Sequence, residues 1–242
     1  MRIIALLAAV PLAACSFHSD DGGPGVTGTG SGTTRSYAVA DFTGVALRGS
    51  DDVDVRVGTG FSVRAEGPSK ELDKLKIERV GDTLRIGRRS QSSFNWGGEH
   101  DDVRVFVTMP MLRAATIAGS GDMVVDRIEG QRFDGDTAGS GSLSVAALAV
   151  REAKIAIAGS GGMSLKGSAD QLDISIAGSG DVDASGLKAT GAKVAVMGSG
   201  SVRADVTGAA SVSVMGSGDV DLGKGAKCST SKMGSGSVTC GS

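Results

Sequence analysis

The sequence has little of what catalytic and nucleic-acid-binding sites are usually made from. Its 242 residues include two histidines, one tryptophan and one tyrosine, and aromatic side chains make up 3% of the chain. So few aromatic rings argue against a surface on which bases or sugars stack. The formal net charge is −2 at pH 7, so the chain also lacks the basic footprint of a protein that binds nucleic acid.

Catalytic motifs are scarce as well. Beyond residue 35 the only histidine is His100, so a Ser-His-Asp arrangement would have to centre on it. The glycines stand between strand-like segments rather than before helices, which excludes Walker and Rossmann motifs. Two acidic groups could serve a β-helix enzyme that cleaves acidic polysaccharides, although solvated loops and strand edges also explain them: Asp51, Asp52 and Asp54, and Glu99, Asp101 and Asp102. We expect no enzyme activity, no metal and no cofactor.

The longest apolar run, residues 3–12, is too short to span a bilayer. Arg2 precedes the run, and Leu12, its last residue, begins the motif Leu-Ala-Ala-Cys that ends at Cys15. This arrangement resembles the lipobox of bacterial lipoproteins, with residues 1–14 as the signal peptide. The resemblance implies acylation of Cys15, for example with palmitate, and Ser16 after it resembles an outer-membrane address. An ordinary signal peptide is the alternative. Residues 15–35, rich in Gly, Ser and Thr, are expected to be the lipidated cysteine and a flexible tether.

Glycine is abundant, at 39 residues, and much of it lies in one repeated phrase, Gly-Ser-Gly. The steps between successive copies are 20, 20, 19, 20, 18 and 18 residues, because the central serines are Ser120, Ser140, Ser160, Ser179, Ser199, Ser217 and Ser235. A fixed period of this size indicates one supersecondary unit stacked on copies of itself.

Apolar residues alternate with small or polar ones on both sides of each Gly-Ser-Gly. Ile174 and Ile176 before Ser179, with Val182 after it, show the pattern. Period two predicts β-strands with one buried face, and the glycines share the inward parity, where a Cβ would collide or φ must be positive. A unit of this length is too short for a βαβ crossover. We therefore predict an all-β fold, a parallel β-helix with one repeat per coil.

The position two residues after each serine supports coil-on-coil stacking. No two successive repeats carry aspartate there, as expected if stacked carboxylates would lie only about 4.8 Å apart. From the first repeat to the last the residues are Asp122, Ser142, Gly162, Asp181, Ser201, Asp219 and Ser237.

Residues 36–242 form the β-helix domain in this interpretation, with regular repeats over 113–242 and a degenerate part over 36–112. In the degenerate part, Gly81-Asp82 predicts a hairpin turn. The long loop 88–101 is a candidate binding loop, and the alternative is that its aromatic residues pack over the end of the solenoid as a cap. Its candidate residues are Arg88, Arg89, Phe94 and Trp96.

Two features of the last repeats carry further predictions. Met197, Met215 and Met233 stand two residues before their serines, where parity predicts an outward apolar stripe, unless the corner turns them inward. Cys228 and Cys240 both have inward parity in the last unit. We expect them to form a disulfide that braces the open end of the solenoid, since the envelope is oxidising; two free buried thiols are the alternative.

With the strand–Gly-Ser-Gly–strand units and the segment VTMPMLRAATIAGSGD over 107–122, the chain resembles the bacterial head GIN domain family, described as an auto-transporter adhesin head. The resemblance covers about residues 37–240. It implies a right-handed parallel β-helix on a bacterial envelope with no enzyme activity. We therefore expect a lipid-anchored binding or adhesion module, on the outer membrane, with a protein or glycan ligand. The alternatives are a polysaccharide-active enzyme and a purely structural envelope protein.

Overall fold

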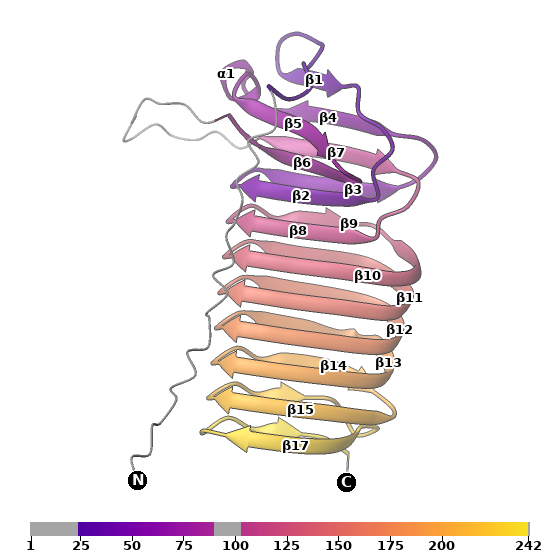
Figure 1. The fold of residues 1–242 in the computed structure, drawn as a ribbon, viewed down its shortest axis with the longest axis vertical. Helices are drawn as coiled ribbons and strands as arrows, with labels where there is room; N and C mark the ends of the chain where they lie inside the picture. The colour runs from indigo at the N-terminus through magenta and orange to yellow at the C-terminus, as the bar shows by residue number, and fades with distance from the viewer. Residues whose placement is uncertain (1–23, 90–102, 242) are drawn as a thin grey trace, which may run out of the picture.

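The chain forms an elongated right-handed parallel β-solenoid (Figure 1). The computed structural model describes residues 24–89 and 103–241. Coils stack one below another from the N-terminal end of this body to the C-terminal end, as the repeat predicts.

The described residues form eighteen strands and one short helix. The strands of the N-terminal part are β1 (Thr34–Tyr37), β2 (Gly44–Gly49), β3 (Asp52–Val57), β4 (Ser62–Glu66), β5 (Leu75–Val80), β6 (Thr83–Arg88) and β7 (Arg104–Met109), with helix α1 (Ser69–Leu72) between β4 and β5. The strands of the regular part are β8 (Ala114–Gly119), β9 (Met123–Val125), β10 (Ile128–Gly139), β11 (Ser142–Gly159), β12 (Gly162–Gly178), β13 (Asp181–Gly198), β14 (Val202–Val206), β15 (Ala209–Gly216), β16 (Val220–Asp221), β17 (Lys227–Met233) and β18 (Val238–Thr239).

Two parallel ladders run the length of the solenoid and meet at the Gly-Ser-Gly corners. The segments that precede the corners pair in the order β6, β2, β8, β10, β11, β12, β13, β15, β17. The segments that follow the corners pair in the order β7, β3, β9, β11, β12, β13, β14, β16, β18. Strands β11, β12 and β13 belong to both ladders because each bends around its coil.

The alternation of apolar and polar residues sets which side chains enter the core. Ile174 and Ile176 are 3% and 1% exposed, whereas Ser175 between them faces solvent. The Cα partners of Ile176 are Ile157 in the coil above and Val196 in the coil below. Aliphatic side chains therefore stack on their counterparts along the solenoid axis, and the predicted inward set is confirmed.

Both reasons anticipated from the sequence, a positive φ and a collision of any Cβ, explain the glycines at the corners. The first glycine of each corner has a positive φ, between +124° and +142° in the seven repeats. A Cβ there would also lie 2.0–2.4 Å from a carbonyl oxygen of the coil above. Neither the backbone conformation nor the coil spacing leaves room for a side chain.

The N-terminal part stacks out of sequence order. The coil of β2 and β3 lies between the coil of β6 and β7 on one side and that of β8 and β9 on the other. Above them β4 pairs antiparallel with β7, and β1 with β4. The antiparallel β5–β6 pair turns at Gly81-Asp82, as the sequence predicts. These strands and α1 form a cap over the N-terminal end of the solenoid (Figure 1).

This order corrects the expectation that no stacked coils carry adjacent aspartates. Val53 is the Cα partner of Met123, so Asp52 and Asp122, each one residue earlier, come together. Asp52 Oδ1 accepts a hydrogen bond from the Asp122 backbone N–H at 3.2 Å, and Arg104 pairs with Asp52 at 3.4 Å. A backbone donor and a cation offset the repulsion that the spacing alone would impose.

The aspartates of the regular coils have a related role. Asp122 Oδ1 accepts a hydrogen bond from the backbone N–H of Ser142 at 2.8 Å, and Asp181 accepts one from Ser201 at 2.8 Å. Asp219 accepts from both the N–H and the hydroxyl of Ser237, at 2.9 and 2.6 Å, and these bonds lower its pKa. Each carboxylate thus binds the start of the next strand, which accounts for a neighbour that is serine rather than a second aspartate.

A disulfide closes the C-terminal end. Cys228 on β17 and Cys240 after β18 are bonded, with their Cα atoms 6.3 Å apart. Thr230 and Lys232 stand opposite Val212 and Val214 of the preceding coil, and Lys232 Nζ donates to the Gly236 carbonyl at 2.8 Å. The last coil therefore ends the apolar core with polar side chains and a covalent brace, and the predicted Cys228–Cys240 pairing is confirmed.

Candidate functional site

The edge of the solenoid formed by the Gly-Ser-Gly corners presents its side chains in columns. The central serines are exposed, and each backbone N–H from Ser120 to Ser217 donates to a glycine carbonyl of the coil above at 2.9–3.0 Å. A second exposed column, two residues earlier in each coil, consists of apolar side chains: Ala118, Ala138, Ala158, Ala177, Met197, Met215 and Met233.

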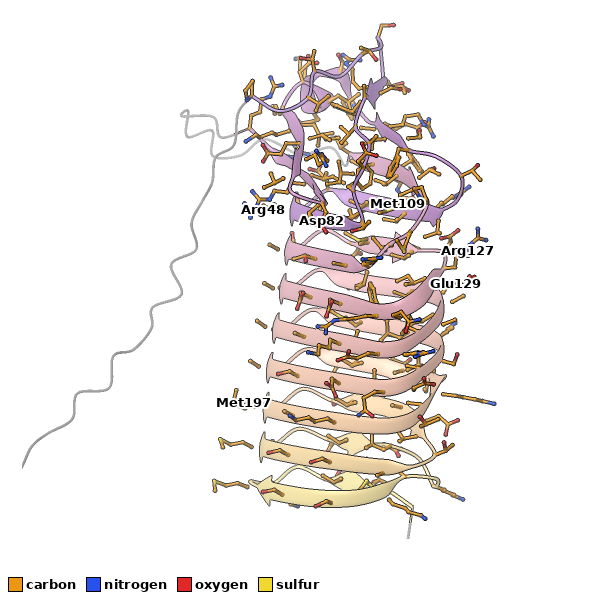
Figure 2. The ribbon with its side chains drawn as sticks, turned by 45° about the vertical axis from the view of Figure 1, so that its right-hand side comes forward. Arg48, Asp82, Met109, Arg127, Glu129 and Met197 are labelled. Carbon is orange, nitrogen blue, oxygen red and sulfur yellow. A yellow bond between two sulfur atoms is a disulfide. The ribbon has the colours of Figure 1, made fainter. Side chains whose placement is uncertain are left out.

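The three methionines of this column form what we call the methionine stripe. Met197, Met215 and Met233 are 57%, 54% and 71% exposed, and each is the Cα partner of the next. Met197 points away from the corner edge in Figure 2. The outward direction predicted from parity is confirmed. The stripe offers unbranched, polarizable side chains that adapt to irregular partner surfaces.

The predicted binding loop is only partly within the described residues. Phe94 and Trp96 lie outside them. Arg88 is the last residue of β6 rather than a loop residue, and Arg89 follows it with an exposed side chain.

Arg88 is occupied inside the protein, so it cannot serve as the free ligand-binding cation that the sequence suggested. Its guanidinium binds both oxygens of Asp51 and one oxygen of Glu71. Asp51 is 1% exposed and Glu71 is 7% exposed. Hydrogen bonds from Lys74 and Arg88 lower the pKa of Glu71. We call Asp51, Glu71 and Arg88 the clasp, because it joins the β2–β3 corner to α1 and β6.

The acidic groups considered for catalysis are separated by the fold. Asp51 is buried in the clasp, whereas Asp52 and Asp54 point outward and pair with Arg104 at 3.4 and 3.7 Å. Glu99, His100, Asp101 and Asp102 lie outside the described residues. Within 24–89 and 103–241, no group of three or more His, Cys, Asp or Glu side chains is placed to hold a metal ion.

A charged column on the outer face of the first ladder is visible only once the coils are stacked. Asp134, Lys154, Asp173 and Lys193 are successive Cα partners, so charges of opposite sign alternate down four coils. A shallow groove of about 370 Å³ lies beside them. Desolvation, together with nearby Asp134, raises the pKa of Asp136 at one end of the groove. The steps between these four residues are 20, 19 and 20 residues, so they have no constant spacing that would reveal the pairing in the linear sequence.

No helix within residues 24–89 and 103–241 is long and apolar enough to cross a bilayer.

A family model described as "Putative auto-transporter adhesin, head GIN domain" matches residues 41–226. No protein among those with curated descriptions matches the chain.

Several solved structures share the fold. A "putative adhesin" from Bacteroides fragilis superposes with a TM-score of 0.78 at 20% identity, covering 86% of this chain and 95% of its own. A "putative lipid binding protein" from Parabacteroides distasonis gives 0.68 at 22% identity, covering 88% and 98%. A "putative adhesin" from the same species gives 0.68 at 21% identity, covering 86% and 96%.

Proposed function

The chain belongs to the head GIN domain family, described as an auto-transporter adhesin head, and from that premise we propose that it is a non-enzymatic binding module at the bacterial cell envelope. A lipid on Cys15 anchors it to the outer membrane, and the solenoid presents a contact surface to a protein or glycan. The family description and the adhesin-like structural neighbours support a surface-associated binding role.

The observation that carries the proposal is the methionine stripe. Among the described residues, the exposed large apolar side chains are Met197, Met215, Met233 and Val124, and three of the four stand in one column. Contiguous exposed apolar side chains mark interaction surfaces. Small neighbours, the alanines above and the serines beside the stripe, keep this edge flat enough for a partner to approach.

The experiment compares adhesion of cells that carry the wild-type chain with adhesion of cells that carry a Met197/Met215/Met233→Ser triple variant. Retention under flow is measured on polystyrene, on mucin-coated glass and on a layer of the same bacteria. We expect the triple variant to lose most retention on at least one surface. The matched control is Val124→Ser, which removes an exposed apolar side chain away from the stripe and should leave retention unchanged.

Equal surface amounts of the variants, measured by antibody, make the comparison valid. Wild-type cells that adhere no better than cells lacking the protein would contradict the adhesion proposal. Retention that the triple variant fully preserves would contradict the assignment to the stripe.

A further inference from the structure

The cap contains a pocket that the adhesion proposal does not use. It has a volume of about 290 Å³ and lies between the segment before β1, β1 itself, the end of α1, the start of β5 and the residue after β6. The residues that carry the argument below are Thr27, Arg35, Tyr37, Leu72, Asp73 and Arg89.

Tyr37 places an unpartnered hydroxyl at this pocket. The residue is 6% exposed, and its phenol makes no hydrogen bond to any described residue. Gly28 packs directly against the ring, because a Cβ at position 28 would lie 2.9 Å from Cε1 and 3.3 Å from the hydroxyl oxygen. Burial raises the pKa of Tyr37, so the hydroxyl stays protonated and available as a donor. The hydroxyl oxygen is accessible from the pocket, because Thr137 Oγ1 is the one fully buried side-chain polar atom without a partner among the described residues. A ligand that enters the pocket can therefore accept a hydrogen bond from the Tyr37 hydroxyl.

Among the described residues that line the pocket, the charges of Arg35, Asp73 and Arg89 leave one positive charge uncompensated. Arg35 pairs with Asp73 at 3.3 Å, and its guanidinium also donates to Ser69 Oγ and to the Gly32 carbonyl at 3.1 Å. Arg89 is held by its backbone N–H, which donates to the Lys74 carbonyl at 2.8 Å. Its guanidinium has no partner among the described residues. The single excess positive charge at the pocket favours a ligand with one negative charge over a phosphate dianion.

The rest of the lining suits a sugar ring. Leu72 is 2% exposed at the pocket wall and offers an apolar surface to ring C–H groups. The Asp73 carboxylate accepts hydrogen bonds from sugar hydroxyls, and the Thr27 hydroxyl both donates and accepts them. The volume is close to the lower bound of ligand pockets, about 300 Å³, which is room for one monosaccharide unit.

We propose that this cap pocket binds the carboxylate-bearing sugar unit of an acidic glycan. In this arrangement Arg89 binds the carboxylate with two parallel N–H···O bonds, as guanidinium groups do. The Tyr37 hydroxyl donates to the ligand beside it, while Arg35 holds Asp73 in place for the ring hydroxyls. The proposal is independent of the methionine stripe.

The test is calorimetric titration of the purified full chain with D-glucuronate, with D-glucose as the neutral comparison. For a single sugar unit we expect a Kd of about 1 mM and at least about tenfold weaker binding of glucose, which lacks the charge-assisted bonds. Arg89→Ala should weaken glucuronate binding about tenfold or more, and Tyr37→Phe about threefold to tenfold. The matched control is Arg151→Ala, an exposed arginine of β11 far from the cap, and it should bind glucuronate like the wild type.

Thermal unfolding of each variant checks that the cap is intact, and because Tyr37→Phe keeps the ring, its melting temperature should match the wild type. Equal affinity for glucuronate and glucose, or glucuronate binding that neither variant weakens, would overturn the proposal. A tripeptide with a free C-terminus that binds more tightly than glucuronate would also overturn it, in favour of a peptide carboxylate. The methionine triple variant should bind glucuronate normally, so failure here and failure of the adhesion proposal are distinguishable.

Discussion

At the residue scale, the solenoid depends on positions where no side chain fits. Gly178 illustrates them: its φ is +131°, and a Cβ would lie 2.3 Å from the Gly159 carbonyl oxygen of the coil above. Gly162, in the strand that leads to Gly178, is different, because a Cβ there would have its nearest contacts at 3.9 Å. Glycine is therefore required at the corner position 178 and merely tolerated at the strand position 162.

Gly178→Ala should lower the free energy of unfolding by about 3 kcal/mol or more, because it combines an unfavourable φ with overpacking against backbone. Gly162→Ser is the control, since its Cα partner in the coil above is Ser142. It should change stability by no more than about 0.5 kcal/mol. Chemical denaturation of both variants measures this, and equal destabilisation would contradict the steric account.

Thr137 is an exception inside the core. It stands between Ile117 and Ile157 in the ladder and is 2% exposed. Its hydroxyl has no hydrogen-bond partner in the part of the chain that the structure describes. Thr137→Val keeps the shape and removes the buried polar atom, so we expect stability to rise by about 1 kcal/mol. A melting temperature lower than that of the wild type would show that the hydroxyl is satisfied in solution.

At the scale of elements, the clasp of Asp51, Glu71 and Arg88 joins α1 and β6 to the β2–β3 coil. Asp51 occupies the place of the second corner glycine, and the Gly121 backbone packs against its carbonyl. The exchange of glycine for aspartate at this corner is thus coupled to an arginine that the regular coils lack. The β2–β3 coil is inserted out of sequence order, and the ion pairs of Arg88 with Asp51 and Glu71 tie it to β6 and α1. The cap and the solenoid therefore form one connected unit.

Arg88→Ala should lower stability by about 3–5 kcal/mol, because it leaves a buried carboxylate unpaired. Arg104→Ala, which breaks exposed pairs to Asp52 and Asp54, should cost less than about 1 kcal/mol. Denaturant melts of the two variants make the comparison. Comparable losses would mean that the clasp contributes no more than a surface ion pair.

The clasp also predicts a pH dependence. The pKa of Glu71 is lowered in the folded state, chiefly by the hydrogen bond from Lys74 and then by that from Arg88. Its stabilisation is therefore present above the ordinary carboxyl pKa of about 4.3 and is lost as pH falls through the lower folded value. Glu71→Gln should flatten this acid dependence in melts taken between about pH 2 and 6. An unchanged dependence would assign the acid sensitivity to other carboxylates.

At the scale of the whole molecule, the proposed anchor determines which end faces the membrane. Eight residues lie between Cys15 and Pro24, where the described chain begins, and the nine steps from Cys15 to Pro24 span at most about 30 Å when fully extended. The segment that follows Pro24 lies at the cap, where the Val26 N–H donates to the Ile77 carbonyl at 2.7 Å. If Cys15 carries the lipid, the cap is near the membrane and the methionine stripe is at the distal end.

Cys15→Ser should move the protein from the membrane fraction to the soluble envelope fraction, since acyl chains provide the membrane affinity. Fractionation and immunoblotting measure this, and intact mass confirms that the acyl groups are lost. A variant that still sediments with membranes after a salt wash would contradict lipid anchoring through Cys15.

The sequence alone determined the fold class, because a Gly-Ser-Gly period near 20 residues and an apolar period of two leave few ways to bury one face of every strand. Parity, a local property that stacking preserves, also predicted the outward direction of Met197 and the pairing of Cys228 with Cys240, and the structure decided against inward methionines and free thiols. Only the tertiary structure decided that Arg88 pairs with the buried Asp51, that Asp52 meets Asp122, and that Tyr37 and Arg89 line one pocket. These contacts join residues from coils that stack out of order, and a contact between degenerate, non-sequential segments leaves no periodic pattern in the chain.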